Sequence, residues 1–137
     1  MGFLLDTNVV SELRKTKPDA SVVSWYERHA DDSVFISALV VGEIRQGIER
    51  LRPRDPRRAG ALDGWLGGLV LAYRDRVLPV TAAIADEWGR LNAAPQPPPA
   101  VDGLMAATAL VHGLTLVTRN LADVTRTGVE AVNPFAG

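Results

Sequence analysis

Short apolar runs alternate with longer amphipathic segments along the 137 residues, and this alternation constrains the fold more than any other feature. Each run is bounded by turn-forming or capping residues, so we interpret the runs as buried strands. The predicted strands cover residues 3–5, 34–36, 77–80, 114–117 and 129–132. The segments between them predict helices over residues 9–14, 20–30, 38–51, 59–73, 82–92 and 101–111. Strands alternating with helices predict an α/β fold, a three-layer α/β/α sandwich with a central parallel sheet.

The length of the chain fits one domain, so we expect residues 1–137 to form a single unit. The sequence has no cysteine, which excludes disulfides, thiolate zinc sites and cysteine nucleophiles. With His29 and His112 as its two histidines, it offers little for a histidine-rich metal site. A net charge of -1 argues against a protein that binds nucleic acid chiefly through bulk positive charge.

The N-terminal segment has no basic residues before its short apolar run, so it does not have the pattern of a signal peptide. No apolar stretch is long enough to cross a bilayer. We therefore expect a cytoplasmic protein with no membrane association.

Acidic and amide side chains follow the predicted strands. Asp6 comes directly after the first strand, Glu43 lies in the helix after the second, and Asp102 lies in the first turn of the helix after a proline-rich loop. Asn120 follows the strand at 114–117, and Asp123 comes about one turn later. Because functional groups in parallel α/β folds gather at the carboxyl ends of strands, we expect these side chains to converge.

Converging carboxylates repel one another unless a cation compensates them. Mg²⁺ suits such a group, because it prefers oxygen ligands and keeps several waters. An ion held there can orient an attacking water and neutralise charge at a phosphate. Each residue also has a structural alternative: Asp6, Asp102 and Asn120 are typical helix caps, and Glu43 and Asp123 fit a solvated surface. Only the whole set of five residues, in this order along the chain, favours a metal site.

Four segments carry a resemblance to a known family. They are Leu4 to Glu12 (LLDTNVVSE), Ile36 to Ile44 (ISALVVGEI), Val101 to Ala109 (VDGLMAATA) and Leu116 to Asn120 (LVTRN), and the tail Val132 to Phe135 (VNPF) continues the pattern. Together they resemble the PIN-domain ribonucleases, in particular the VapC-like toxins of toxin–antitoxin pairs. The resemblance covers nearly the whole chain.

The resemblance implies a parallel α/β/α sandwich and an endoribonuclease that depends on Mg²⁺ or Mn²⁺. It assigns metal binding to Asp6, Glu43 and Asp102. Asn120 stands where many relatives have a fourth acid, and either its amide oxygen or the nearby Asp123 completes the site.

Neighbouring residues have supporting roles in this hypothesis. Thr7 and Asn8 are expected to orient Asp6 or a bound water. Thr118 and Arg119 are expected to contact the RNA backbone, with a turn-stabilising pair as the alternative.

The resemblance also implies a homodimer and a cognate antitoxin that blocks the active site. Trp65, Leu66, Leu69 and Leu71 fit either a partner groove or the core. Six arginines gather between residues 45 and 58: Arg45, Arg50, Arg52, Arg54, Arg57 and Arg58. They fit an RNA contact, a docking surface for an acidic partner or a solvated helix end.

Three other functions stay open from the sequence. A phosphatase with Asp6 as nucleophile is disfavoured, because Asn8 stands where a second acid is usual and no lysine follows Lys17. A DNA-directed nuclease would use the same metal chemistry. A binding module with this fold and no catalysis is the non-enzymatic alternative, and Asn120 is the residue that supports it.

Overall fold

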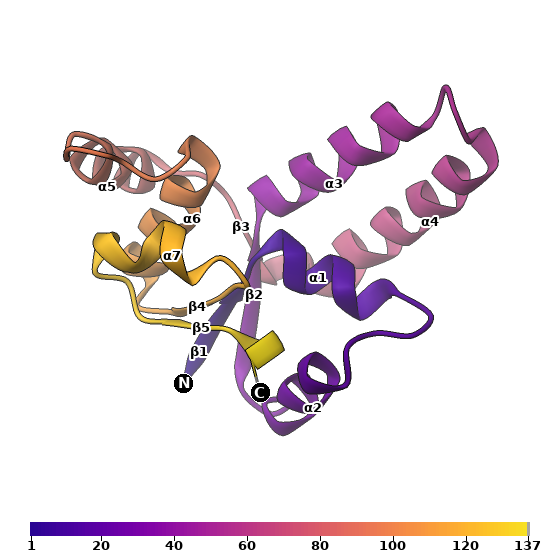
Figure 1. Ribbon diagram of the computed structural model, residues 1–137, viewed down its shortest axis with the longest axis horizontal. Coiled ribbons are helices and arrows are strands. Elements are labelled where there is room, and N and C mark those ends of the chain that lie inside the picture. Colours follow the sequence, from indigo (N-terminus) through magenta and orange to yellow (C-terminus); the bar gives the residue numbers. More distant parts are fainter. Residues whose placement is uncertain (137) are drawn as a thin grey trace.

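The computed structural model describes residues 1–136, in which five parallel strands form one sheet (Figure 1). The strands are β1 (Gly2–Leu5), β2 (Ser33–Ser37), β3 (Val77–Leu78), β4 (Thr115–Val117) and β5 (Ala131–Val132). Their order across the sheet is β3-β2-β1-β4-β5. Leu4 lies opposite Phe35 of β2 on one side and Leu116 of β4 on the other. β1 is thus the central strand.

Helices cover both faces of this sheet. Figure 1 shows α1 to α4 on one side and α5 and α6 on the other. Their bounds are α1 (Thr7–Arg14), α2 (Ala20–Arg28), α3 (Ala38–Leu51), α4 (Pro56–Tyr73), α5 (Ala82–Asn92), α6 (Ala100–His112) and the single turn α7 (Leu121–Val124). Short 3-10 turns cover Arg74–Arg76, Thr125–Thr127 and Pro134–Ala136. The predicted three-layer α/β/α sandwich is therefore confirmed.

Side-chain caps set the helix boundaries, and two helices begin earlier than the sequence predicted. α1 begins at Thr7, where the Asp6 carboxylate accepts a hydrogen bond from the Thr7 N–H. α4 begins at Pro56, because Asp55 caps it and proline is well tolerated in a first turn. The glycines of α4 do not interrupt it; packing outweighs their low helix propensity.

The outer strands are shorter than predicted. β3 ends at Leu78 because Pro79 has no backbone N–H to donate to a neighbouring strand. β5 covers Ala131–Val132 and not the predicted 129–132. The sequence prediction also lacked α7, which follows Asn120.

The core fills the space between the sheet and both helical layers. Leu4, Leu5 and Ile36 from the strands are fully buried, as are Val40 from α3 and Ala106 from α6. Among residues 1–136 no helix is long and apolar enough to cross a membrane.

Close packing of α5 against α6 depends on Gly103. A Cβ placed on Gly103 would lie 2.7 Å from Oδ1 of Asn92 and 3.2 Å from Cδ1 of Trp88. Gly103 is buried and directly follows Asp102. The contact therefore sets the position of the first turn of α6, which carries Asp102.

Candidate active site

The candidate site lies where the chain changes direction across the sheet. From β1 the chain builds β2 and β3 on one side, and it returns to build β4 and β5 on the other. In parallel α/β sheets, ligand sites are expected at the carboxyl ends of the strands where the strand order reverses in this way, which here are β1 and β4. Asp6 directly follows β1, and Thr118 directly follows β4.

The carboxylate of Asp6 is fixed by its neighbours and is almost fully buried. Its Oδ1 accepts a 2.7 Å hydrogen bond from the Thr7 N–H, which also caps α1. Its Oδ2 accepts a 2.7 Å hydrogen bond from the Thr118 hydroxyl and a weaker one, 3.4 Å, from Nδ2 of Asn8. Asp6 thus acts as helix cap and as an oriented carboxylate at once.

Asn8 and Thr118 join the loops after β1 and β4. The Asn8 Nδ2 lies 3.4 Å from the Thr118 hydroxyl oxygen, and the Asn8 Oδ1 accepts a 3.2 Å hydrogen bond from the Arg119 N–H. The Thr118 oxygen also accepts a 3.0 Å hydrogen bond from the Asn120 N–H. These contacts join the two loops directly beside Asp6.

Glu43 is linked to the same edge through Thr7. The Thr7 hydroxyl donates to Oε1 of Glu43, which brings the second turn of α3 against the start of α1. Glu43 is partly exposed, so its other oxygen is open to solvent or to a ligand.

Asp102 completes a group of acids drawn from four segments of the chain. Burial, followed by the nearby charges of Asp6, Asp123 and Glu43, raises the pKa of Asp102 to about 6. A side-chain hydrogen bond with Asp123 raises that pKa further. We call Asp6, Glu43, Asp102 and Asp123 the acid cluster. Burial disfavours the ionised form of Asp102, and the three neighbouring carboxylates disfavour it further.

The donor set fits a hard divalent cation. All four side chains offer carboxylate oxygens, the ligands that Mg²⁺ prefers. Within residues 1–136 no three acidic or histidine side chains stand close enough to form a ready-made metal cage. Mg²⁺ is usually bound through one or two carboxylates and several waters, so this looser arrangement suits it.

The two predicted fourth ligands, Asp123 and Asn120, have different surroundings. Asp123 lies beside Asp102, whereas the exposed Asn120 occupies the N-cap of α7 and its side chain makes no hydrogen bond within residues 1–136.

The burial of Thr118 contradicts the prediction that its side chain contacts RNA. Thr118 is fully buried and its hydroxyl is used on Asp6. The alternative prediction of a turn-stabilising role fits Thr118. Arg119 is exposed, and its guanidinium lies 3.8 Å from the centre of the Phe135 ring.

Sequence reasoning did not single out the buried carboxylate of Glu12. It accepts hydrogen bonds from Lys15 Nζ at 2.8 Å and from the Asp19 N–H at 2.9 Å. The Lys15 bond holds the pKa of Glu12 below its usual value. In the sequence, the three-residue spacing between Glu12 and Lys15 could have indicated this ion pair. The bond to the Asp19 N–H gives Glu12 a role in joining α1 to α2.

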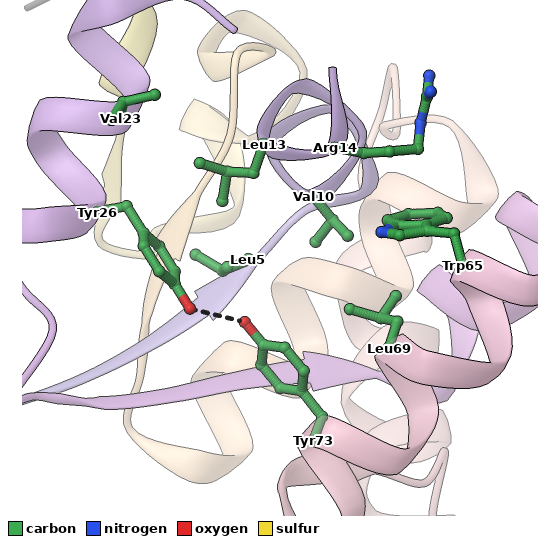
Figure 2. Close-up of a pocket in the computed structure, with 9 residues that line it drawn as sticks. All are labelled: Leu5, Val10, Leu13, Arg14, Val23, Tyr26, Trp65, Leu69 and Tyr73. Atoms are coloured by element: carbon green, nitrogen blue, oxygen red, sulfur yellow. Dashed lines mark hydrogen bonds between the residues drawn. The ribbon is translucent and has the colours of Figure 1, made fainter. Parts of the chain in front are cut away.

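Two hollows meet beside the acid cluster. One, of about 240 Å³, is bounded by Thr7, Glu43, Leu62 and Trp65. The other, of about 370 Å³, is an apolar groove between α1, α2 and α4 (Figure 2). Its walls include Leu13, Val23, Tyr26, Leu69 and Tyr73. Arg14 and Trp65 line both hollows, so the groove adjoins the hollow that reaches Glu43.

Comparison with known proteins identifies the family of this chain. The profile of the PIN domain matches residues 3–126. The chain belongs to the PIN-domain family. The resemblance inferred from the sequence motifs is thereby confirmed, and all four members of the acid cluster fall within the matched range.

Two relatives match this chain over almost their whole length. The chain is 32% identical to the VapC ribonuclease Y4jK of Sinorhizobium fredii, covering 97% of each protein. It is 31% identical to the toxin FitB of Neisseria gonorrhoeae, covering 97% of this chain and 98% of FitB.

Solved structures show the same PIN fold. The FitAcB crystal structure from Neisseria gonorrhoeae superposes with a TM-score of 0.88 at 30% identity, over 97% of this chain and 98% of that one. VapBC2 from Rickettsia felis, bound to a promoter DNA fragment, gives 0.74 at 21% identity, over 97% and 98%. At 21% identity, the likeness to VapBC2 shows a shared fold and no more.

Proposed function

We propose that this PIN-domain protein is a metal-dependent endoribonuclease and the toxin of a toxin–antitoxin pair. The observation that carries the proposal is the acid cluster at the carboxyl edge of a parallel sheet, where burial and then the nearby charges of the other three acids raise the pKa of Asp102 to about 6. Full-length relatives that are named VapC ribonuclease and toxin FitB support it.

In this proposal Asp6, Glu43 and Asp102 hold Mg²⁺ or Mn²⁺, with Asp123 beside them as a further ligand or as a holder of a metal-bound water. When bound, the ion supplies charge neutralisation at the scissile phosphate and activation of the attacking water. Thr118 and Asn8 keep the Asp6 carboxylate in one orientation, and Thr7 keeps Glu43 near it. Fixed carboxylates need no reorganisation during the reaction.

The test is cleavage of a mixed RNA pool by the purified protein with Mg²⁺, Mn²⁺ or EDTA, beside Asp6→Asn. The proposal expects metal-dependent cutting that the variant lacks. A parallel DNA pool separates a DNA-directed nuclease from a ribonuclease. No cutting of either pool by folded, antitoxin-free protein would favour the non-catalytic binding module.

The apolar groove of Figure 2 is the proposed seat of the antitoxin. Trp65, Leu69 and Tyr73 from α4 face Tyr26 from α2 across it, and the Tyr26 and Tyr73 hydroxyls lie 3.4 Å apart at its floor. A helix with one apolar face fits such a groove. Because the groove leads past Arg14 to Glu43, a segment that follows the helix can cover the acid cluster and block RNA.

A matched pair on α4 tests the groove. Leu69→Lys places a charge inside the groove, whereas Leu71→Lys changes a side chain that is 62% exposed and outside it. Coexpressed with the antitoxin from its own locus, the Leu71 variant is expected to copurify with it and the Leu69 variant to lose it. Equal copurification by two folded variants would contradict the proposed seat.

A homodimer is also part of the proposal. A hollow of about 350 Å³ next to Glu43 is lined by Leu39, Val80 and Val101, and Val80 is 42% exposed. A second copy seated there would bring two acid clusters to one surface. Light scattering of Val80→Glu is expected to give a monomer where the unaltered protein gives a dimer.

A further inference from the structure

The hairpin formed by α3 and α4 carries charge of two kinds. Between Arg45 and Asp63 six arginines face three acids, in a chain whose net charge is -1. Figure 1 shows the hairpin projecting away from the sheet, with its turn at the far end. The residues around this turn therefore have a charge opposite to that of the acid cluster.

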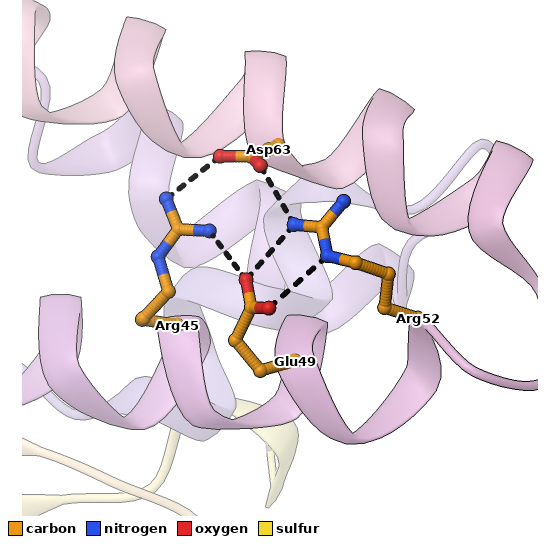
Figure 3. A network of polar contacts seen from close by, with 4 residues as sticks. All are labelled: Arg45, Glu49, Arg52 and Asp63. Carbon is orange, nitrogen blue, oxygen red and sulfur yellow. Dashed lines mark hydrogen bonds and ion pairs between the residues drawn. The ribbon is translucent and has the colours of Figure 1, made fainter.

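Two of the three acids are engaged along the length of the hairpin (Figure 3). Asp63 of α4 accepts hydrogen bonds from Arg45 at 2.7 Å and from Arg52 at 2.8 Å. Glu49 of α3 accepts from the same two arginines at 3.0 and 2.8 Å. These bonds hold the pKa values of both Glu49 and Asp63 at about 2. Both acids stay ionised: Asp63 joins α4 to α3, and Glu49 holds the two arginines in place along α3.

Four arginines remain around the turn, and we name them the basic tip: Arg50, Arg54, Arg57 and Arg58. All four are exposed, and none forms an ion pair within residues 1–136. The third acid, Asp55, accepts a 3.1 Å hydrogen bond from the Arg58 N–H and caps α4. The cross-braced helices thus present four guanidinium groups on a stiff support.

The basic tip and the acid cluster share one helix. Glu43 lies near the start of α3 and Arg50 near its end, so the axis rises about 10 Å between them. The hollow bounded by Thr7, Glu43, Gly47 and Leu62 extends between α3 and α4 in the direction of the tip. A phosphate chain with one phosphate at the acid cluster can reach the tip within a few nucleotides.

The surface chemistry of the tip favours a phosphate backbone over a protein. The exposed large hydrophobic residues are Met1, Val70, Leu71, Val80 and Val111, and none lies between Arg45 and Asp63. Protein interfaces combine an apolar centre with a polar rim. Charge without apolar area is typical of a surface that positions nucleic acid through its phosphates.

We propose that the basic tip binds the backbone of the RNA strand whose scissile phosphate lies at the acid cluster. The inference rests on the proposed ribonuclease function. It assigns the tip a role in holding substrate and none in the chemical step. Long RNA is therefore bound through two separated surfaces, and very short RNA through the acid cluster alone.

The test compares Arg54→Gln/Arg57→Gln with the control Arg28→Gln/Arg74→Gln, which removes the same charge from exposed positions outside the hairpin. Binding of a labelled, unstructured RNA of about twenty nucleotides is followed by fluorescence anisotropy in EDTA, where metal-dependent cutting is off. The tip variant is expected to raise Kd roughly three- to tenfold more than the control does. Its salt dependence is expected to flatten by about 1.4 log units per log unit of salt.

Cleavage assays separate the two proposals. With Mg²⁺ or Mn²⁺ the tip variant is expected to raise KM for long RNA and to cut a trinucleotide as the unaltered protein does. RNA binding and KM equal to those of the control would overturn the inference and leave the nuclease function standing. Loss of binding to a polyglutamate peptide with RNA binding unchanged would overturn it in favour of an acidic protein partner. A protein that cuts no RNA but loses RNA affinity in the tip variant would refute the nuclease function alone.

Discussion

The hydroxyl of Thr118 donates a 2.7 Å hydrogen bond to Oδ2 of Asp6 and so joins the carboxyl ends of β4 and the central strand β1. Both residues are buried, although 112 positions separate them in the chain. The bond fixes one carboxylate of the acid cluster and leaves no freedom for Thr118 to meet RNA.

Replacing Thr118 with valine keeps the shape of the side chain and removes this bond. We expect metal affinity to fall roughly tenfold or more, as is common when a group that orients a metal ligand is lost. Isothermal titration with Mn²⁺ measures the change. Thr118→Ser keeps the hydroxyl and is expected to retain most of the affinity; equal losses in both variants would contradict the positioning role.

The raised pKa of Asp102 predicts a pH dependence of stability without metal. The pKa rises from 3.8 to about 6 on folding, so between these values the folded protein binds more protons than the unfolded chain. The contribution of Asp102 to stability is therefore fully present below pH 4 and is lost as the pH rises through 6. Because the residue is partly exposed, we expect an effect on the order of 1 kcal/mol.

Urea unfolding in EDTA across this pH range measures that contribution. Asp102→Asn is expected to flatten the pH dependence and to be the more stable protein at neutral pH. Adding Mg²⁺ at neutral pH is expected to stabilise the unaltered protein more than the variant. An unchanged pH profile in the variant would show that Asp102 is not the titrating group.

Variants of Asp123 and Asn120 test which of the two residues is the fourth metal ligand. Asp123→Asn is expected to weaken Mn²⁺ binding by roughly tenfold, because it removes the acid beside Asp102. Asn120→Ala is expected to change the same affinity little. The reverse order of effects would place Asn120, and not Asp123, in the site.

Gly103 predicts a packing effect that reaches the acid cluster. Gly103→Ala puts a methyl group against Asn92 and Trp88, and we expect a loss of about 1–3 kcal/mol in stability together with weaker metal binding through Asp102. Gly89→Ala is the control, because its Cβ meets open space in α5; it is expected to stabilise by about 0.5–1 kcal/mol. Thermal unfolding of both variants measures the two effects. A stabilised Gly103→Ala variant would refute the close contact of Gly103 with Asn92 and Trp88.

The sequence predicts the fold well where local signals act alone. Apolar runs mark β1, β2 and β4, and Asp6 marks both the start of α1 and the candidate site. The outer strands are less predictable. The pairing of β3 with β2 ends at Leu78, because Pro79 has no backbone N–H to donate a hydrogen bond. The gathering of Asp6, Glu43 and Asp102 was predicted, while their role in metal binding stays a prediction.

Long-range contacts explain what the sequence did not reveal. Thr118 follows an apolar strand in the same way whether it faces solvent or Asp6, so its burial depends on the partner strand. The proximity of Asp123 to Asp102 depends on how α7 packs on α6. Likewise, the bonds of Arg45 and Arg52 to Asp63 depend on the pairing of α3 with α4, whereas their bonds to Glu49 follow from local helix spacing.

The most direct test of the central claim is an anomalous difference map from crystals soaked in Mn²⁺. The account predicts a peak at the acid cluster, within coordination distance of carboxylate oxygens of Asp6, Glu43 or Asp102, and its loss in Asp6→Asn crystals. A Mn²⁺ peak at other acids with none at this edge of the sheet, or a peak that persists unchanged in the variant, would contradict the assignment of the metal site.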